Sequence, residues 1–537
     1  MSFATWYYPV FLWVVAMTFW AVPRHRLAII LFASFVFYGF WDVRFCSLLI
    51  AAAVSDYLCS RGIESDPPPT VEVIGLGMLP AVWLVAVSVF KGVSAFHIAA
   101  TALACLSFCW LFIAFSREPI DSRRRLLLFL AIGVNLGILV SFKYANWFSA
   151  GLVALLGHLG IVADGVLLDI LLPVGISFHT FQSIAYVVDV HDKRCKAEPG
   201  FGRVLCMIMF FPQLVAGPIE RAGHILPQLR FEKRFDWRFV MWGLHLLLIG
   251  YFLKIFVADN CAIIADYYFK KVHLGESFGT GWALTGTAAY AAQIYGDFVG
   301  YSYIARGSAI MLGVELTRNF ELPFLSRSPL EFWRRWHISL STWIRDYVFL
   351  PLSLSISYRN HSTVTGGPLV SDSLVVSLCL IITMLLAGLW HGADWHYIAF
   401  GGFHGVLQVL WLVVPGAKKL SSSPAFPARI ASCVLTFVLV CIAWILFRSE
   451  SLADANSILL TLAGVSSHGA EVPRGVILWW ALHAAPMVML IAITRKYQEE
   501  ADIVQRSTAV VSISYFFMIL LLASSEAGRA QFIYFQF

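Results

Sequence analysis

Residues 373–390 read SLVVSLCLIITMLLAGLW, a run without a single charged side chain. A helix rises about 1.5 Å per residue, so about 20 apolar residues cross the hydrocarbon core of a bilayer. Similar runs recur along the chain, at 4–22, 27–53, 73–91, 95–115, 126–148, 238–258, 396–414, 428–447, 475–494 and 507–524. The run therefore predicts a membrane helix, and its repetition predicts a bundle of such helices.

The composition of the whole chain points the same way. Of its 537 residues, 59% are hydrophobic and 13% are charged. Soluble proteins carry roughly a quarter charged residues, so these charges cannot cover several water-soluble domains. Aromatic residues make up 15% of the chain, which is too apolar for a disordered protein. The net charge of +6 is spread over short loops, which argues against a nucleic-acid partner.

Several further apolar stretches are interrupted by glycine, proline or charge: 150–172, 173–190, 203–217, 282–296 and 301–314. Interrupted backbone at membrane depth needs surrounding protein or a polar cavity. We therefore predict an all-α, polytopic transmembrane helical bundle of about 11–13 spans. Re-entrant and amphipathic interfacial helices surround a central cavity in this prediction, and residues 1–537 form a single integral membrane domain.

Two other features carry no chemistry. No positive charge precedes the first apolar run, so we interpret residues 4–22 as a first span and not as a cleavable signal. The ten cysteines are scattered without a CxxC pair, which predicts neither a metal framework nor a disulfide framework.

Ionisable residues inside apolar runs mark candidate functional sites, because each costs about 2.5–3.5 kcal/mol at a helix centre. Lys143, Lys254 and Asp297 are the main examples. The lysines could instead extend to the membrane interface. For Asp297 a structural hydrogen-bonding role and a catalytic role both remain open.

Residues 331–351 read EFWRRWHISLSTWIRDYVFLP, which predicts one amphipathic helix. At helical spacing Arg334, His337, Ser341 and Arg345 share one face, opposite a face of aromatic residues. The polar face predicts a helix that points towards a polar cavity. The alternative is an anchoring helix at the membrane surface without chemistry.

Residues 383–405 read TMLLAGLWHGADWHYIAFGGFHG and place His391 at the end of an apolar helix. A histidine there is either structural or a proton-transfer residue, and spacing alone leaves both open. Gly388 and Gly392 allow the close approach of another backbone. We predict no metal site here, because His391, Asp394, His396 and His404 do not form a known ligand spacing.

Residues 210–228 read FFPQLVAGPIERAGHILPQ. Three prolines and a glycine cannot form a regular span. We expect a re-entrant or loop element here, with Glu220 and Arg221 on its polar edge.

Three segments taken together resemble the membrane-bound O-acyltransferase (MBOAT) family, and most of all its bacterial alginate-O-acetyltransferase-like subgroup. They are residues 210–229 (FFPQLVAGPIERAGHILPQL), residues 293–352, beginning QIYGDFVGYSYIARG, and residues 385–405 (LLAGLWHGADWHYIAFGGFHG). AWILFRSESLADA (443–455) and the final FIYFQF (532–537) are similar to the same subgroup. The resemblance makes 173–455 the catalytic core, whereas 1–125 holds spans of only generic similarity.

The resemblance implies an enzyme, an O-acyltransferase, and assigns its site. Its catalytic histidine matches His391, and its second site residue matches His337. Substrate-binding roles are expected for Arg334, Arg335, Trp336, Asp297 and Trp390. The implied donor is acetyl-CoA or another acyl thioester, with no tightly bound cofactor and no metal. In this hypothesis His391 takes a proton from the acceptor hydroxyl, and His337 or a neighbouring arginine donates to the oxyanion.

The resemblance also implies the setting: a multi-pass protein in the bacterial inner (cytoplasmic) membrane, in contact with lipid. The acyl group would move towards an exported polysaccharide, through a periplasmic or membrane-anchored acetyl-accepting partner of the SGNH type. Two alternatives stay open. A secondary transporter shares many spans and broken helices, and a non-catalytic scaffold of an export complex would need neither histidine.

Overall fold

The structure is a computed structural model that describes residues 3, 5–64, 67–161, 172–215, 217–361, 371–465, 469–496 and 508–523. Within these residues every regular element is a helix, and the one isolated β-bridge joins Phe278 and Ala470. The all-α prediction is therefore confirmed. The chain forms two compact units, Met1–Leu244 with Ala305–Thr317, and His245–Ile304 with Arg318–Phe537.

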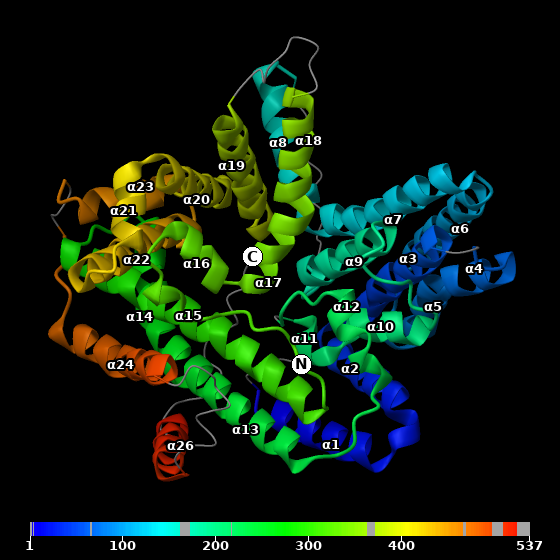
Figure 1. Cartoon of the computed structure of the whole chain (residues 1–537), viewed down its shortest axis with the longest axis horizontal. Coiled ribbons are helices and arrows are strands. Elements are labelled where there is room, and N and C mark those ends of the chain that lie inside the picture. Colours follow the sequence, from blue (N-terminus) through cyan, green and yellow to red (C-terminus); the bar gives the residue numbers. More distant parts are fainter. Residues whose placement is uncertain are drawn as a thin grey trace. The chain divides into compact units, whose positions relative to one another are not determined.

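The first unit is built on α3 (Cys46–Glu64), α7 (Ile120–Lys143) and α9 (Ile176–His191), which pack against one another (Figure 1). The side of α3 that these helices cover is buried almost throughout. The other helices of this unit are α1 (Tyr7–Ala21), α2 (Arg26–Asp42), α4 (Thr70–Gly77), α5 (Leu79–Lys91), α6 (Ala95–Ser116), α8 (Ala145–His158), α10 (Phe201–Met209), α11 (Phe211–Leu214) and α12 (Ala222–Ile225), with 3-10 turns at Pro23–His25, Val43–Phe45 and Gln228–Arg230.

The segment 210–228 is interrupted, as its prolines predict. Only the single-turn helices α11 and α12 form within it, and a 3-10 turn begins at its last residue, Gln228. Glu220, expected on a polar edge, is instead fully buried. Its carboxylate accepts hydrogen bonds from the Thr317 hydroxyl at 3.0 Å and from His224 Nδ1 at 2.7 Å. These two donors allow a charge to lie inside the protein.

The second unit contains a hairpin of α19 (Asp372–His391) and α20 (Trp395–Val413), with α16 (Pro329–Arg335) and α22 (Phe426–Arg448) against α20 (Figure 1). Its other elements are α14 (Asp259–His273), α17 (Ile338–Ile344), α18 (Leu350–His361), α21 (Pro415–Ser422), α23 (Leu452–Leu462), α24 (Arg474–Lys496) and α26 (Thr508–Ala523), with a 3-10 turn at Pro323–Leu325 and π-helical segments η4 (Phe252–Ala258) and η6 (Arg345–Phe349).

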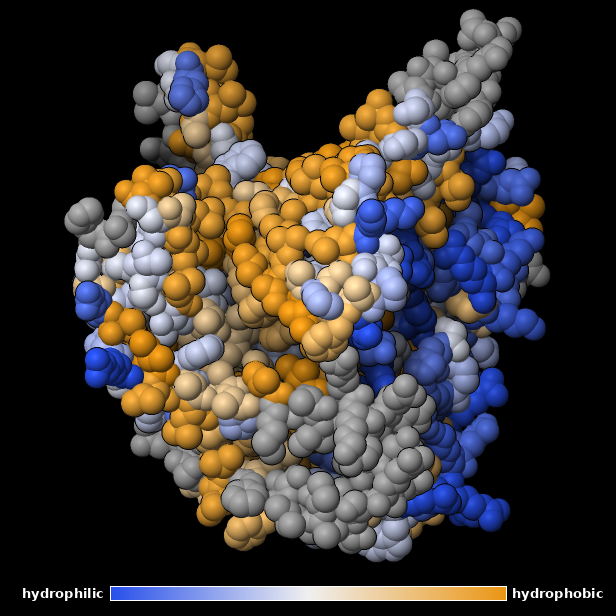
Figure 2. All heavy atoms as spheres, turned by 60° about the vertical axis from the view of Figure 1, so that its left-hand side comes forward, coloured by the Kyte–Doolittle hydropathy of each residue, from blue (hydrophilic) through white to orange (hydrophobic). Residues whose placement is uncertain are grey.

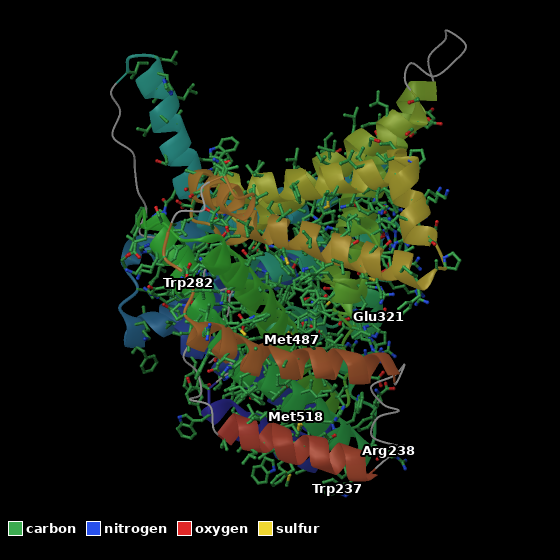
Figure 3. All side chains as sticks on the ribbon, turned by 90° about the vertical axis from the view of Figure 1, so that its left-hand side faces the viewer. Trp237, Arg238, Trp282, Glu321, Met487 and Met518 are labelled. Atoms are coloured by element: carbon green, nitrogen blue, oxygen red, sulfur yellow. The ribbon has the colours of Figure 1, made fainter. Side chains whose placement is uncertain are left out.

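Two long helices have residues in both units: α13 (Trp237–Tyr251) and α15 (Thr280–Met311). After α13 the helix continues through η4 into α14 without a break. Both α24 and α26 pack against η4. Figure 3 shows these two helices, marked by Met487 and Met518.

Two predicted boundaries are corrected. The stretches 282–296 and 301–314, treated as separate, form the single 32-residue helix α15. The intervening Asp297 and Gly300 do not stop it, because a helix tolerates both once tertiary contacts support it. The stretch 27–53 instead divides into α2 and α3. The Asp42 carboxylate breaks it there by accepting from the Arg44 backbone N–H at 2.9 Å.

In the described part of the chain, eight helices are long and apolar enough to cross a membrane. Their outer surfaces are apolar. On α22, Ile430, Val434 and Val438 are each about half exposed, and Figure 2 shows hydrophobic atoms over much of the visible face. Isolated exposed apolar residues are common on soluble proteins, but extended apolar surfaces are not. The polytopic membrane bundle is therefore confirmed. Of the stretch 150–172, residues 162–171 lie outside the described residues.

Candidate active site

The segment around His337 is not one helix, so the predicted continuous helix over 331–351 is wrong. α16 ends at Arg335, and the backbone of Trp336 is extended, with φ −105° and ψ 128°. His337 then takes a left-handed conformation, with φ 44° and ψ 54°, before α17 begins. Such a conformation costs a residue with a Cβ atom about 1–3 kcal/mol, so other contacts must hold it.

The contacts that hold this break come from residues 319–321. The Ile338 backbone N–H donates to the Asn319 carbonyl at 2.9 Å, and the Glu321 N–H donates to the Arg335 carbonyl at 2.9 Å. The Ser341 hydroxyl can also donate to the Trp336 and His337 carbonyls, each at 3.1 Å. Backbone groups that a helix would pair within itself are paired here with another part of the chain. This tertiary pairing overrides the amphipathic pattern.

The Asn319 side chain fixes the tautomer of His337. Asn319 Oδ1 accepts from the Ser339 backbone N–H at 3.1 Å and from the Ser339 hydroxyl at 2.9 Å. A backbone N–H only donates, so this side-chain atom is the amide oxygen. His337 Nδ1 lies 3.2 Å from the same oxygen and must therefore be the donor. A neutral imidazole protonated on Nδ1 carries its lone pair on Nε2.

His337 is neutral at physiological pH. Only 1% of its surface is exposed, and burial lowers the pKa of its imidazole to about 3. Removal from water disfavours the charged form of a histidine. The ring is also held edge-on by Phe298, with centroids 4.7 Å apart and planes at 87°. His337 is thus a fixed, neutral group whose Nε2 can accept a hydrogen bond.

His391 is held by a regular element. α19 ends at this residue, and Asp394 caps α20 by accepting from the His396 backbone N–H at 3.2 Å. The two helices touch through their backbones, since a Cβ atom on Gly388 would lie 3.1 Å from Gly401 Cα. The close approach expected at Gly388 is confirmed. His391 itself is buried and meets the edges of Phe447 and Phe400, with centroid distances of 5.1 and 5.8 Å.

The indole of Trp390 contacts both histidines. Its ring centroid lies 4.8 Å from that of His391 and 6.3 Å from that of His337. Trp390 is buried, and its N–H is a donor only. Two histidines from different sequence motifs therefore contact one indole.

A third buried histidine, His404, has the opposite arrangement. Trp333 Nε1 donates to His404 Nδ1 at 3.2 Å, so the neutral ring carries its proton on Nε2. Phe400 contacts both His404, at 4.8 Å, and His391, at 5.8 Å. His404 belongs to the aromatic packing beside the site.

The four residues considered for a metal do not converge. His396 Nδ1 bonds the Leu446 carbonyl at 3.1 Å, while His404 faces Trp333. In the described ranges no group of three or more histidine, cysteine, aspartate or glutamate side chains is placed to hold a metal ion.

The expected substrate-binding residues lie in different environments. Arg334 is exposed, whereas Arg335 forms an ion pair with Glu331 at 2.8 Å. Trp336 is buried and stacks on Phe332, with centroids 5.6 Å apart. Arg334 therefore does not share the face of His337 that the helical pattern predicted, because the backbone turns at Trp336.

Asp297 is buried in an ion pair with Lys254, whose Nζ lies 2.7 Å away. The same Nζ lies 2.7 Å from Asp259. Lys254 therefore does not extend to the membrane interface. The second carboxylate, Asp259, was missed in the sequence, although an aspartate five residues after a lysine in an apolar run was a usable signal.

Asn319, Ser339 and Phe298 were also missed. Asn319 lies in the irregular stretch ELTRNFELPF (315–324), where no periodicity marks a buried residue. Its importance comes from hydrogen bonds to residues about twenty positions later. Only the fold reveals such contacts.

Comparisons with known proteins bear on these residues. The sequence model of the MBOAT, membrane-bound O-acyltransferase family, matches residues 198–452, which include His337, Trp390 and His391. This range lies inside the core expected from the motifs.

Individual relatives agree with the family. The chain is 32% identical over 443 residues to the probable alginate O-acetylase AlgI of Pseudomonas syringae, covering 81% of this chain and 69% of that protein. It is 26% identical to the peptidoglycan O-acetyltransferase of Helicobacter pylori, over 94% of this chain and 90% of the relative. It is 29% identical to the teichoic acid D-alanyltransferase of Bacillus subtilis, over 51% of this chain and 68% of the relative.

These relatives are named as acyltransferases, and the matched range holds both buried histidines. The chain thus belongs to the membrane-bound O-acyltransferase family and is a multi-pass membrane acyltransferase.

Proposed function

We propose that this acyltransferase moves an acetyl group from a cytoplasmic thioester donor, acetyl-CoA, to hydroxyl groups of an exported polysaccharide. The observation that carries the proposal is that His337 and His391 both contact the indole ring of Trp390. The names of the relatives support the acetyl group and a glycan acceptor, since they refer to O-acetylation of alginate and of peptidoglycan.

His391 is the general base in this proposal. Its imidazole takes the proton of the acceptor hydroxyl while that oxygen attacks the acyl carbonyl carbon. The tetrahedral intermediate then breaks the C–S bond. The departing thiolate takes the proton back from His391, so that an O-acetyl ester and a free thiol leave and the enzyme is unchanged. Histidine suits this role because its ordinary pKa, about 6.5, lies near the working pH.

His337 orients the acceptor. With its proton on Nδ1 and bonded to Asn319, Nε2 can accept a hydrogen bond from a hydroxyl group. The same tautomer cannot donate to an oxyanion, so the donor role first expected of His337 passes to another group. We assign that role to the indole N–H of Trp390, because it lies beside both histidines and is always a donor.

In this proposal the exposed Arg334 attracts the anionic donor towards the site, and Arg335 and Trp336 keep the substrate-binding roles that the family resemblance implies. An exposed guanidinium raises the local concentration of an anion, and salt weakens this effect. Asp297 has its own ion pairs and is considered separately below.

The cellular setting is part of the proposal. The protein would lie in the bacterial inner (cytoplasmic) membrane, receive acetyl groups on the cytoplasmic side and deliver them outwards. An acetyl-accepting partner of the SGNH type would complete the transfer to the polymer.

The test uses purified protein in proteoliposomes with acetyl-CoA and a soluble acceptor such as an alginate or peptidoglycan oligosaccharide. Thiol release and ester formation, read by mass spectrometry, report the reaction. The wild type should form both products, and His391→Ala should lower the rate by about 10²–10⁴-fold. His158→Ala, which changes an exposed histidine on α8, is the matched control and should keep full activity.

Two outcomes would favour other functions. Uptake of the oligosaccharide into vesicles without acetyl-CoA consumption would indicate a transporter. Unchanged polymer acetylation in cells carrying His391→Ala or His337→Ala would indicate a scaffold.

A further inference from the structure

We propose that Lys254, Asp259 and Asp297 form a positioning triad that sets His337 for acyl transfer, by fixing Phe298 against the imidazole ring. The inference rests on the proposed function, because its readout is acyl transfer.

The triad is buried and tightly paired. Lys254 is 1% exposed, Asp259 3% and Asp297 2%. Lys254 Nζ lies 2.7 Å from a carboxylate oxygen of each aspartate. Buried charges are tolerated only when paired at short range, so loss of Lys254 would leave two carboxylates uncompensated. An arrangement this demanding is specific to one geometry of the helices that carry it.

The π-helical segment η4 makes this geometry possible. Lys254 lies within η4, and Asp259 follows directly at its end. Residues five apart do not share a face of an α-helix, whereas the i→i+5 pairing of a π-helix brings them to the same side. The wider turn therefore allows one ammonium group to meet Asp259 on its own helix and Asp297 on α15.

The backbone of α15 lies directly against this segment. A Cβ atom on Gly296 would lie 2.7 Å from the Leu253 carbonyl oxygen, and one on Gly300 would lie 2.8 Å from the Gly250 carbonyl oxygen. Both distances are too short for any side chain. Asp297 and Phe298 lie between these two contact points. The ion pair thus fixes α15 at Phe298, both in its rotation about the helix axis and in its position along that axis.

Phe298 passes this position on to His337. Its ring meets the imidazole edge-on at 4.7 Å and 87°, and it also meets Phe320 at 4.9 Å and 72°. Asn319 holds His337 by Nδ1, and Phe298 holds it by the ring. A hydrogen bond alone lets the ring tilt about the bond, whereas two constraints fix the direction of Nε2.

The triad itself is placed to act through other residues and not by contact with substrate. Each carboxylate has Lys254 as a charge partner, and the ammonium group also lies 5.7 Å from the Tyr301 ring. For Asp297 this geometry favours positioning over the substrate-binding role expected from sequence.

The test compares kcat and KM for acetyl transfer by Asp297→Asn, Phe298→Leu and the double variant, in the full-length protein in proteoliposomes. Asp297→Asn should lower kcat by about tenfold to a hundredfold and leave the KM for acetyl-CoA unchanged, since small misplacements of a catalytic group have effects of this size. The kcat of the double variant should fall little further than that of the more affected single variant, because both changes release the His337 imidazole.

Asp266→Asn is the matched control. It removes the carboxylate of another ion pair of this unit, in which Asp266 lies 2.7 Å from Arg448. Among the described contacts, neither residue of this pair touches Phe298. This variant should keep its kcat. Thermal unfolding and gel filtration in detergent verify the fold of each variant.

Should Asp297→Asn fail to fold, the triple variant Lys254→Met, Asp259→Asn, Asp297→Asn is used instead, because it removes all three buried charges. It should fold and show the same loss of kcat. A folded variant with wild-type kcat, or losses that simply multiply in the double variant, would overturn the inference. A wild type inactive with acetyl-CoA would instead contradict the proposed function.

Discussion

The two histidine segments reach one indole ring by opposite means. His391 ends the regular apolar helix α19, where composition and length alone determine the structure. His337 lies at a break with positive φ, held by bonds from residues 319–321. The regular geometry of α19 places His391 without backbone strain, whereas His337 needs hydrogen bonds from another segment to hold its conformation. Strained backbone that is stabilised by several neighbours is a recognised mark of functional sites.

The largest expected effect concerns both histidines at once. His391→Ala and His337→Ala should each reduce acetyl transfer strongly, and the double variant should lose no more than the larger single loss. Groups that act as one unit are non-additive in this way. Steady-state rates of the two single variants and the double variant provide the measurement. Losses that multiply would separate the two histidines into independent roles.

Asn319→Ala should release His337 while leaving the contacts of His391 unchanged. Loss of the shared oxygen releases His337 Nδ1 and two donor groups of Ser339. We expect kcat to fall by about tenfold to a hundredfold and the free energy of unfolding to fall by about 1–3 kcal/mol. Kinetics and thermal unfolding of the same preparation check both. Asn135→Ala, which removes a buried amide bonded to the Asp56 carboxylate and the Ala131 carbonyl in the first unit, is the control.

The effect of the left-handed backbone at His337 on stability should be separable from the role of its imidazole in the reaction. Asparagine tolerates the left-handed conformation better than other residues with a Cβ atom. His337→Asn should therefore be inactive but more stable than His337→Val, by about 1–2 kcal/mol. Unfolding midpoints in detergent decide this, and equal stability of the two variants would argue against strain at this position.

A smaller effect should appear with pH. The unfolded chain binds a proton at His337 near pH 6.5, whereas the folded protein, with its pKa at about 3, does not. Stability from this residue is therefore complete above pH 6.5 and falls by up to about 1.4 kcal/mol per pH unit below it. The difference in unfolding midpoint between wild type and His337→Asn, measured from pH 7 to pH 5, should shift in favour of the variant. A constant difference would contradict the buried neutral histidine.

The smallest effect is expected at Arg334. Its exposed guanidinium can only attract the donor, so Arg334→Ala should raise the KM for acetyl-CoA by less than about tenfold, and less at high salt. An unchanged kcat would accompany it. A loss of kcat comparable to that of Asn319→Ala would place Arg334 in the site.

The sequence was sufficient for the features that rest on local patterns. Long apolar runs gave the membrane helices, and Gly388 gave the close approach of α19 and α20. The helix over 331–351 failed because its hydrogen bonds are taken by residues 319–321, and pattern arguments do not include such partners.

The candidate site divides in the same way. His337, Trp390 and His391 were found through motifs, and the fold brings them together. Asn319 and the Lys254 triad depend on contacts between distant segments. The amphipathic pattern also grouped Arg334 with His337, although one backbone turn at Trp336 sends them to different environments.

In the proposed mechanism, His391 transfers the proton during acetyl transfer from acetyl-CoA. The most direct measurement is a single turnover of purified protein with labelled acetyl-CoA and an acceptor oligosaccharide, followed by mass spectrometry of the ester. We expect ester formation by the wild type, none within the same time by His391→Ala, and equal donor binding by both. Ester formation at the wild-type rate by His391→Ala would contradict the role of His391 as the general base.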